Sequence, residues 1–210
     1  MYLSLLRLNT RSRRALTESS RPYELHRSLM KAFPEQAEGG AGRVLFRLDK
    51  DDTTGGISVL VQSEKKPVWE NLNGFSDYVA DAKYKEYSPE VKNDQVLRFR
   101  LRANPTKRSK HSGKREGILK MEDQVAWLEK KGEDGGFDIL SVNAVNEGFS
   151  RDGLTDSGKV KHTTTMLSVR FDGVLRVTDT DVFNNTLTSG IGPAKGFGFG
   201  LLSIALVRGN

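Results

Sequence analysis

The chain has 210 residues, and its 36% hydrophobic and 29% charged content is typical of a soluble globular protein with room for one large domain or two small ones. It contains no cysteine, which excludes disulfides, zinc ribbons, iron–sulfur clusters and thiol nucleophiles. No apolar run is long enough for a transmembrane helix, and the first residues lack the features of a signal peptide, so we expect a cytoplasmic protein.

The first half of the chain predicts one ferredoxin-like unit, because its expected elements follow the order β-α-β-β-(α)-β. In chain order these are a strand over Tyr2–Leu8, a helix from Pro22 to about Phe33, strands over Arg43–Leu48 and Ile57–Gln62, and a short helix or irregular segment within Pro67–Tyr87 that ends in a strand near Tyr84–Tyr87. Proline is tolerated in a first helical turn, which favours a helix start at Pro22. The N-cap is ambiguous between Ser20, a good capping residue, and Arg21, a poor one.

The second half of the chain predicts the same order of elements. These are a strand over Gln95–Ala103, a basic loop over Asn104–Gly117, a helix over Lys120–Lys131, strands over Phe137–Phe149 and Thr163–Phe171 joined by a polar hairpin (Ser150–His162), a strand over Gly173–Val177 after an Asp172-Gly173 turn, a helix over Thr180–Thr188 and a last strand over Gly200–Val207. We therefore expect an α+β fold of two tandem ferredoxin-like (βαββαβ) domains. The N-terminal domain is expected over 1–88, a linker over 89–94 and the C-terminal domain over 95–210.

Positive charge is concentrated in two blocks of this chain, whose formal net charge is +6. Residues 1–31 carry +5 and residues 95–120 carry +8, which leaves −7 for the remainder. Two basic blocks on an acidic body suit a polyanion that touches one face, and phosphate is the obvious polyanion. A solvated basic surface without a ligand is the alternative interpretation.

The strand expected over Gln95–Ala103 alternates between two kinds of side chain. One face carries Arg98, Arg100 and Arg102, and the other carries Leu97, Phe99, Leu101 and Ala103. This period of two predicts a half-buried strand that displays three arginines in a row.

Chemistry-bearing side chains gather on one face of the helix expected from Pro22. At about 100° per residue, that face carries Tyr23, His26, Arg27, Met30 and Lys31, opposite Leu25, Leu29 and Ala32. Histidine titrates near neutral pH and can move a proton, and arginine and lysine neutralise charge that builds on a phosphorane-like transition state. These are the parts that metal-free RNA cleavage by the ribose 2′-OH requires. A solvated amphipathic helix with an idle surface histidine is the alternative.

A glycine-rich loop precedes the last strand. Five of the eleven residues in Gly190–Gly200 are glycine, which lets a backbone approach a ligand closely and present its N–H groups. The loop is neither a P-loop nor a dinucleotide-binding fingerprint, because Lys195 is followed by glycine and no βαβ unit follows. A plain tight connection into the strand is the alternative. No pair of the three histidines has a metal-ligand spacing, so no metal site is expected; a site assembled from distant parts of the chain is the alternative.

Three segments together resemble one protein family: Tyr23-Glu24-Leu25-His26-Arg27 on the helix, the strand that runs from Leu97 to Pro105, and the Gly190–Gly200 loop. They make the chain similar to the CasE-type CRISPR-associated pre-crRNA endoribonucleases, the processing subunits of the type I-E Cascade complex. The similarity covers essentially the whole chain, including its length and the order of its elements. One departure is Arg21, which stands before Pro22 where family members often have a helix-capping asparagine.

The resemblance implies tandem ferredoxin-like domains of the RAMP type that bind the CRISPR repeat stem-loop and cleave pre-crRNA at the 3′ base of the hairpin. It implies a metal-independent reaction without a cofactor, in which 2′-OH attack leaves a 2′,3′-cyclic phosphate and a 5′-OH. It further implies that the enzyme remains with the crRNA and contacts other Cascade subunits. We expect no membrane association and a monomer outside the complex.

By motif match, the resemblance assigns His26 as the general acid/base, Tyr23 as its partner at the scissile phosphate and Lys31 as an electrostatic stabiliser. The residues expected to bind RNA are Arg27, Arg98, Arg100, Arg102, Lys107, Arg108, Lys110, Lys114, Arg115, Arg151, Lys159, Lys161, Gly190, Gly192 and Lys195. In the family a hairpin like Ser150–His162 probes the groove at the base of the stem, so Arg151 is the expected sequence-reading residue.

Two other functions compete with the endoribonuclease. The first is a non-catalytic RNA-binding subunit of a CRISPR ribonucleoprotein complex, which has no need of Tyr23, His26 and Lys31 on one helix face. The second is an unrelated ferredoxin-like RNA chaperone, which predicts aromatic residues that stack on bases at the sheet face. Phe99 lies on the strand face opposite the arginines, and this disfavours the chaperone.

Overall fold

The computed structural model describes residues 1–35, 39–72, 74–109, 113–156 and 159–207, with the side chains of residue 151 and residues 153–163 outside the description. The chain forms two compact units. Unit 1 consists of residues 1–88, 152–164 and 196–198, and unit 2 consists of residues 89–151, 165–195 and 199–210. The division at residues 88 and 95 that the sequence suggests stays a prediction.

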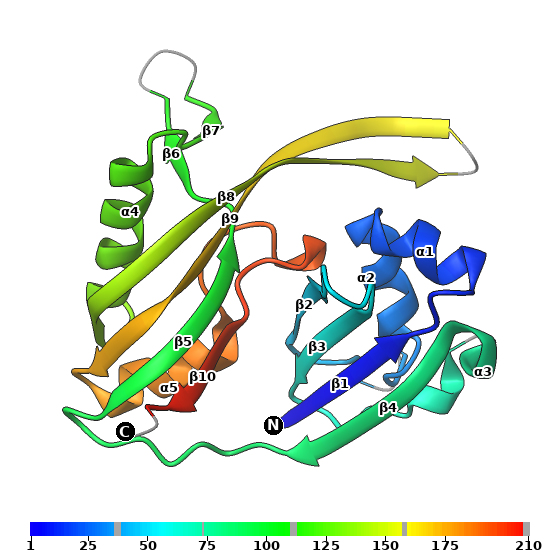
Figure 1. The fold of residues 1–210 in the computed structure, drawn as a ribbon, viewed down its shortest axis with the longest axis horizontal. Coiled ribbons are helices and arrows are strands. Elements are labelled where there is room, and N and C mark those ends of the chain that lie inside the picture. Colours follow the sequence, from blue (N-terminus) through cyan, green and yellow to red (C-terminus); the bar gives the residue numbers. More distant parts are fainter. Residues whose placement is uncertain (36–38, 73, 110–112, 157–158, 208–210) are drawn as a thin grey trace. The chain divides into compact units, whose positions relative to one another are not determined.

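Unit 1 is built on a four-stranded antiparallel sheet with the strand order β2-β3-β1-β4 (Figure 1). The strands are β1 (Tyr2–Leu8), β2 (Val44–Lys50), β3 (Ile57–Ser63) and β4 (Val79–Glu86). The helical segments are α1 (Arg13–Ser19), α2 (Pro22–Met30), the 3₁₀ turn η2 (Trp69–Asn71) and α3 (Phe75–Tyr78). The first strand lies between the third and the fourth, which is the order of a ferredoxin-like sheet.

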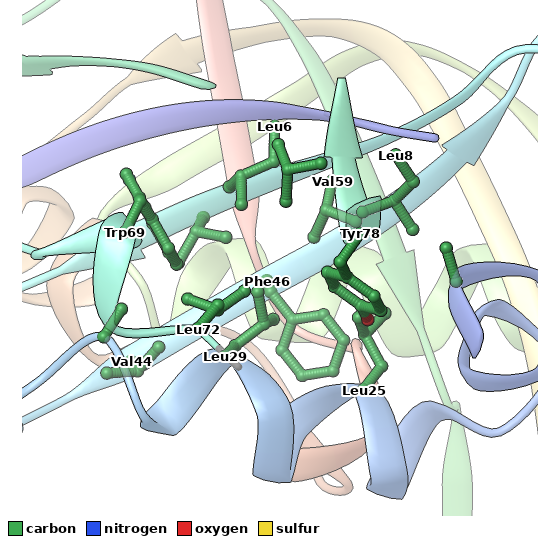
Figure 2. Packing of buried hydrophobic residues seen from close by; sticks show 14 of the residues in the cluster. Leu6, Leu8, Leu25, Leu29, Val44, Phe46, Val59, Trp69, Leu72 and Tyr78 are labelled. Carbon is green, nitrogen blue, oxygen red and sulfur yellow. The ribbon is translucent and has the colours of Figure 1, made fainter. Parts of the chain in front are cut away.

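Helix α2 is held by the apolar side chains on one of its faces. Leu25 and Leu29, one turn apart, are 1% and 0% exposed. Figure 2 shows both leucines in the cluster that contains Phe46 of β2 and Tyr78 of α3. Burial of a leucine side chain contributes about 1.5–3 kcal/mol, so this face fixes the rotation of the helix. The opposite face, which carries Tyr23, is therefore held in a defined direction.

Helix α1 is absent from the sequence prediction. It begins after Ser12, whose hydroxyl accepts a hydrogen bond from the Ala15 amide at 3.4 Å. Ala15 is the helix's buried residue, so the segment has no apolar period that would indicate a helix. An ion pair of 2.8 Å between Arg14 and Glu18, one turn apart, supports it instead.

Two boundaries in unit 1 differ most from the predicted ones. Helix α2 ends at Met30, because its last turn tightens: the amide of Lys31 donates to the Ser28 carbonyl at 3.1 Å, and that of Phe33 donates to the Met30 carbonyl at 3.2 Å. Strand β4 begins at Val79, well before the predicted start, because β1 pairs with it along its whole length.

Unit 2 contains the second four-stranded sheet, with the order β10-β5-β9-β8. Its strands are β5 (Val96–Ala103), β8 (Phe137–Asp156), β9 (Lys159–Val177) and β10 (Leu202–Leu206), and the ends of β8 and β9 extend into unit 1. The helices are α4 (Met121–Glu133) and α5 (Thr180–Ser189), and the 3₁₀ turn η3 (Lys195–Phe197) that follows begins in unit 2 and ends in unit 1. The order fourth-first-third-second repeats that of unit 1, which confirms the predicted α+β fold of tandem ferredoxin-like domains.

The basic loop predicted over Asn104–Gly117 contains a small hairpin. Its strands are β6 (Thr106–Arg108) and β7 (Arg115–Gly117), paired antiparallel. In the same way, β8 and β9 continue through most of the segment predicted as a polar hairpin at Ser150–His162.

The predicted turn at Asp172-Gly173 is wrong, because β9 runs through it without interruption. A Cβ at Gly173 would meet the Ser141 carbonyl oxygen and would come within 2.9 Å of the Phe99 ring. Glycine is therefore present because another backbone approaches closely, which is one of the usual reasons for glycine inside a strand.

Candidate functional site

The face of α2 opposite the core carries Tyr23 and His26, and both side chains are half-buried. Residues three apart are neighbours on a helix surface, so the phenol and the imidazole lie on the same side. The structure thus brings together the first two of the three residues that the sequence suggests for catalysis.

The imidazole of His26 lies in a largely apolar environment. The Phe46 ring stacks on it with 5.9 Å between centroids and 12° between planes. A Cβ at Gly196 would lie 3.7 Å from His26 Cδ2 and 3.8 Å from Nε2, so Gly196 is near the ring and an added methyl group would be in van der Waals contact with it. The Nδ1 atom is buried and has no hydrogen-bond partner among the described residues. Burial lowers the pKa of His26 below the ordinary value of 6.5, because an imidazolium ion loses hydration there.

We expect an NMR titration of the RNA-free protein to give His26 a pKa below 6.5. The neutral ring then predominates at neutral pH and offers a nitrogen that can accept a proton. Because the folded state disfavours protonation, this residue's contribution to stability is complete above pH 6.5 and declines as the pH falls toward the lowered pKa. The resonance is assigned by its loss in His26→Gln, and a midpoint at or above 6.5 would contradict the prediction.

Residues Gly196–Gly198 of the glycine-rich loop belong to unit 1, together with α2. The Phe197 ring lies 5.7 Å from the Tyr23 ring, centroid to centroid, at a tilt of 32°. Gly198 has φ of +82° and a Cβ there would come within 3.0 Å of the Phe46 ring, so both the backbone and the contact demand glycine. The glycine-rich segment therefore packs against the Tyr23 ring and against the Phe46 ring that stacks on His26.

Arg27 and Lys31 are exposed and lie on α2 or at its end. The Arg27 guanidinium forms an ion pair of 3.1 Å with Glu24. Lys31 is the C-cap residue. Both side chains are exposed, so they are accessible to a phosphate. Their roles remain predictions.

The arginine face of β5 is present as predicted, since the burial of the strand alternates along its whole length. Arg98 is exposed, whereas the other two arginines are part of an ion-pair network. The pairs are Arg100 with Asp172, Arg102 with Glu147 at 2.7 Å, Arg170 with Asp172 at 3.0 Å and Arg170 with Glu147 at 4.0 Å. The network retains a net positive charge, but the acidic partners reduce what Arg100 and Arg102 offer to an RNA. The sequence prediction missed both acids.

A pocket of about 510 Å³ in unit 2 gathers several residues predicted to bind RNA. Lys107, Arg108, Arg115, Gly190 and Gly192 line it. Trp127 and Lys131 of α4, which sequence reasoning did not select, line it as well, together with Asp134, Gly135, Thr186, Ile191, Pro193 and Thr106. A Cβ at Gly192 would come within 3.1 Å of the Trp127 ring, so this glycine allows the loop to approach the indole. The pocket is basic and has an aromatic wall, a combination typical of nucleic-acid contacts.

The remaining predicted RNA-binding residues are not gathered in that pocket. Lys114 is exposed on the hairpin formed by β6 and β7, and Lys195 is half-buried at the start of η3. Lys110 lies outside the described residues, and so do the side chains of Arg151, Lys159 and Lys161.

No group of three or more histidine, aspartate or glutamate side chains among the described residues is arranged to hold a metal ion. No described helix is long and apolar enough to cross a membrane.

The chain matches known proteins along almost its entire length. The family model described as CRISPR associated protein matches residues 1–205. This chain belongs to that family. The CRISPR-associated endoribonuclease Cse3 of Thermus thermophilus is 38% identical over 216 residues, which cover 98% of this chain and all of the relative. The Cascade subunit CasE of Escherichia coli K12 is 34% identical over 197 residues, 87% of this chain and 91% of the relative.

A solved structure of Cse3 bound to a 19-nucleotide RNA shares the fold of this family member. It has a TM-score of 0.87 and 37% identity, and the match covers 98% of this chain and all of the other. The resemblance to CasE-type endoribonucleases inferred from three short segments is thereby confirmed over the whole chain.

Proposed function

We propose that this chain is a metal-independent endoribonuclease that binds the CRISPR repeat stem-loop and cleaves pre-crRNA at the 3′ base of the hairpin. The ribose 2′-OH attacks the adjacent phosphate and leaves a 2′,3′-cyclic phosphate and a 5′-OH. The observation that carries the proposal is the half-buried His26, next to Tyr23 on one face of α2, in a chain 38% identical to an endoribonuclease.

The chemistry of the site suits this reaction. The lowered pKa of His26 keeps its ring neutral, so it can accept the proton of the 2′-OH. The Tyr23 phenol is a donor on the same helix face, and it can orient a phosphate oxygen or the leaving oxygen. The positive charges of Lys31 and Arg27 can neutralise the negative charge that develops on the phosphorane-like transition state.

The RNA is held mainly through its phosphates. An A-form major groove is deep and narrow, so a stem is recognised largely by shape and backbone contacts. The basic pocket with Lys107, Arg108 and Arg115 and the exposed Arg98 provide such contacts in unit 2. Base-specific contacts come from the hairpin that carries Arg151, beside Lys159 and Lys161. Phosphate contacts position the RNA, and base contacts specify it.

The enzyme keeps its product and joins other Cascade subunits in the cytoplasm, where the precursor transcript is present. Two relationships support this part of the proposal. One relative is a Cascade subunit of E. coli, and one similar structure holds RNA. Outside the complex the chain acts as a monomer.

The test is a cleavage assay in EDTA on a repeat stem-loop RNA from the source organism's own CRISPR array. We expect cleavage of the all-ribose RNA and no cleavage of an RNA that carries a single 2′-deoxyribose 5′ of the expected cut, because that sugar lacks the nucleophile. Tight binding of both RNAs without cleavage would favour the non-catalytic RNA-binding subunit. Cleavage of the deoxy substrate would exclude 2′-OH attack.

A further inference from the structure

We propose that Asp152 is a positioning residue for RNA cleavage, because its carboxylate caps the helix that carries Tyr23 and His26. The catalytic consequence rests on the proposed function, whereas the capping itself does not. Asp152 lies on β8, far in the sequence from α2, and belongs to unit 1 together with that helix.

The first turn of α2 has no cap of its own. Arg21 is the N-cap residue and its side chain makes no capping hydrogen bond. Pro22 lacks an amide hydrogen, and the Leu25 amide donates to the Arg21 carbonyl at 3.0 Å. The amides of Tyr23 and Glu24 consequently have no carbonyl within the helix to which they can donate a hydrogen bond. A helix start of this kind requires an acceptor from elsewhere in the chain.

Asp152 supplies that acceptor. The Tyr23 amide donates to Asp152 Oδ2 at 2.6 Å, although 129 positions separate the two residues. Asp152 is buried, with only 5% of its surface exposed. A buried carboxylate is unfavourable unless it is hydrogen-bonded or faces positive charge, and the N-terminus of a helix provides both. The contact therefore satisfies a buried acid and an orphan amide together.

The donor is the backbone of a residue expected to act in catalysis. Tyr23 is the second residue of α2, and its ring contacts Phe197. Fraying of the first turn would move the phenol away from the imidazole that follows one turn later. Asp152 directly follows Arg151, the residue expected to read the RNA groove. The hydrogen bond from the Tyr23 amide to Asp152 thus connects β8, which also contains Arg151, to the helix α2 that carries the expected catalytic residues.

The first experiment compares Asp152→Ala with Asp152→Asn. Alanine removes the acceptor, and we expect the single-turnover cleavage rate at saturating RNA to fall roughly 2- to 30-fold, the equilibrium effect of losing a helix N-cap. Asparagine retains an acceptor oxygen and is expected to keep most of the rate. The Kd for the uncleavable 2′-deoxy RNA is expected to stay unchanged in both variants, because the residue acts on α2 and not on the RNA.

The second experiment restores a cap next to the helix. Asparagine is among the best N-cap residues, so Arg21→Asn can accept from the same turn without Asp152. We expect the double variant Arg21→Asn/Asp152→Ala to recover most of the cleavage rate, and the single variant Arg21→Asn to cleave like the wild type. Recovery by a substitution at the N-cap of α2 would have no explanation if Asp152 touched the RNA or merely stabilised β8.

Hydrogen exchange of the Tyr23 amide reads the cap without any chemistry. We expect faster exchange in Asp152→Ala and protection again in the double variant. A wild type that leaves RNA uncut would overturn the proposed function, while the exchange data would still decide the capping. Unchanged exchange in Asp152→Ala, a loss of rate that Arg21→Asn does not repair, or a loss that is confined to Kd would each overturn the positioning role.

Discussion

His26→Ala is expected to lower the single-turnover cleavage rate by roughly 10²–10⁴-fold, the usual contribution of a general acid or base. Two features of its environment give the reason. The ring stacks on the Phe46 ring and is near Gly196, so its position is defined. Burial lowers its pKa, so the ring is in the proton-accepting form at neutral pH. Removal of the side chain takes away the acceptor and leaves space beside Phe46.

Binding is expected to survive this substitution. One imidazole is a small part of an interface made mainly of phosphate contacts, so the Kd for the 2′-deoxy stem-loop should change little. Thr17→Ala, on the exposed side of the neighbouring helix α1, serves as the control and should cleave normally. Added imidazole should restore part of the rate to His26→Ala, because the vacated space admits a small base. If His26→Ala loses RNA binding or fails to fold, and does not specifically lose the cleavage rate, His26 is a structural residue.

Local patterns in the sequence sufficed for the elements whose burial follows one period. The alternation over Val96–Ala103 predicted both the strand β5 and its arginine face. The 3.6-residue period over Pro22–Met30 separated Leu25 and Leu29 from the face with Tyr23 and His26. The order of the elements then predicted two ferredoxin-like sheets, which both strand orders confirm.

The errors of the sequence prediction come from interactions that are distant in the chain. Gly173 was predicted as a turn residue, yet its lack of a Cβ makes room for Ser141 and Phe99. The arginines of β5 were predicted to bind RNA, but the sequence did not reveal that Asp172 and Glu147 from other strands pair with two of them. Nothing in a local window signals either effect, because strand pairing decides which side chains face each other.

The candidate site shows the same limit. The helix face with Tyr23 and His26 follows from spacing alone, whereas the contacts that complete it do not. Gly196 is near His26 although most of the chain separates the two in sequence. Asp152, which is also distant in sequence, caps the helix that begins with a poor N-cap residue. The unsuitable Arg21 was the one sequence signal that an external acceptor was required.

The second large effect concerns two arginines on the β6–β7 hairpin. Arg108 and Arg115 are directly opposite each other in the register, and both line the basic pocket. Like charges at opposite positions of a strand pair are destabilising. Lys107, which is opposite Glu116 in the register, lines the same pocket, and Lys131 there forms an ion pair of 3.1 Å with Asp134. A phosphate at this position would relieve the repulsion and accept charge-assisted hydrogen bonds from both guanidinium groups.

Arg108→Gln/Arg115→Gln is therefore expected to weaken binding of the uncleaved stem-loop by roughly 10²- to 10⁴-fold, the effect of losing two hydrogen bonds to charged groups at about 1.5–3 kcal/mol each. The plot of log K against log salt concentration should become less steep by about 1.5, since two fewer counterions are released. The melting temperature of the RNA-free protein should not fall, because the substitution removes a repulsion. Cleavage at saturating RNA should stay close to the wild-type rate.

The matched control is Lys83→Gln/Lys85→Gln, which removes the same charge from exposed positions on β4. If the whole basic surface attracts RNA through net charge alone, both double variants lose affinity equally and their salt slopes change together. If the hairpin holds particular phosphates, the loss and the change of slope are confined to the arginine pair. The second outcome is expected, because Arg108 and Arg115 converge on one pocket, whereas Lys83 is already paired with Asp81 at 3.6 Å. Equal slopes for the wild type and the arginine variant would remove this hairpin from the RNA interface.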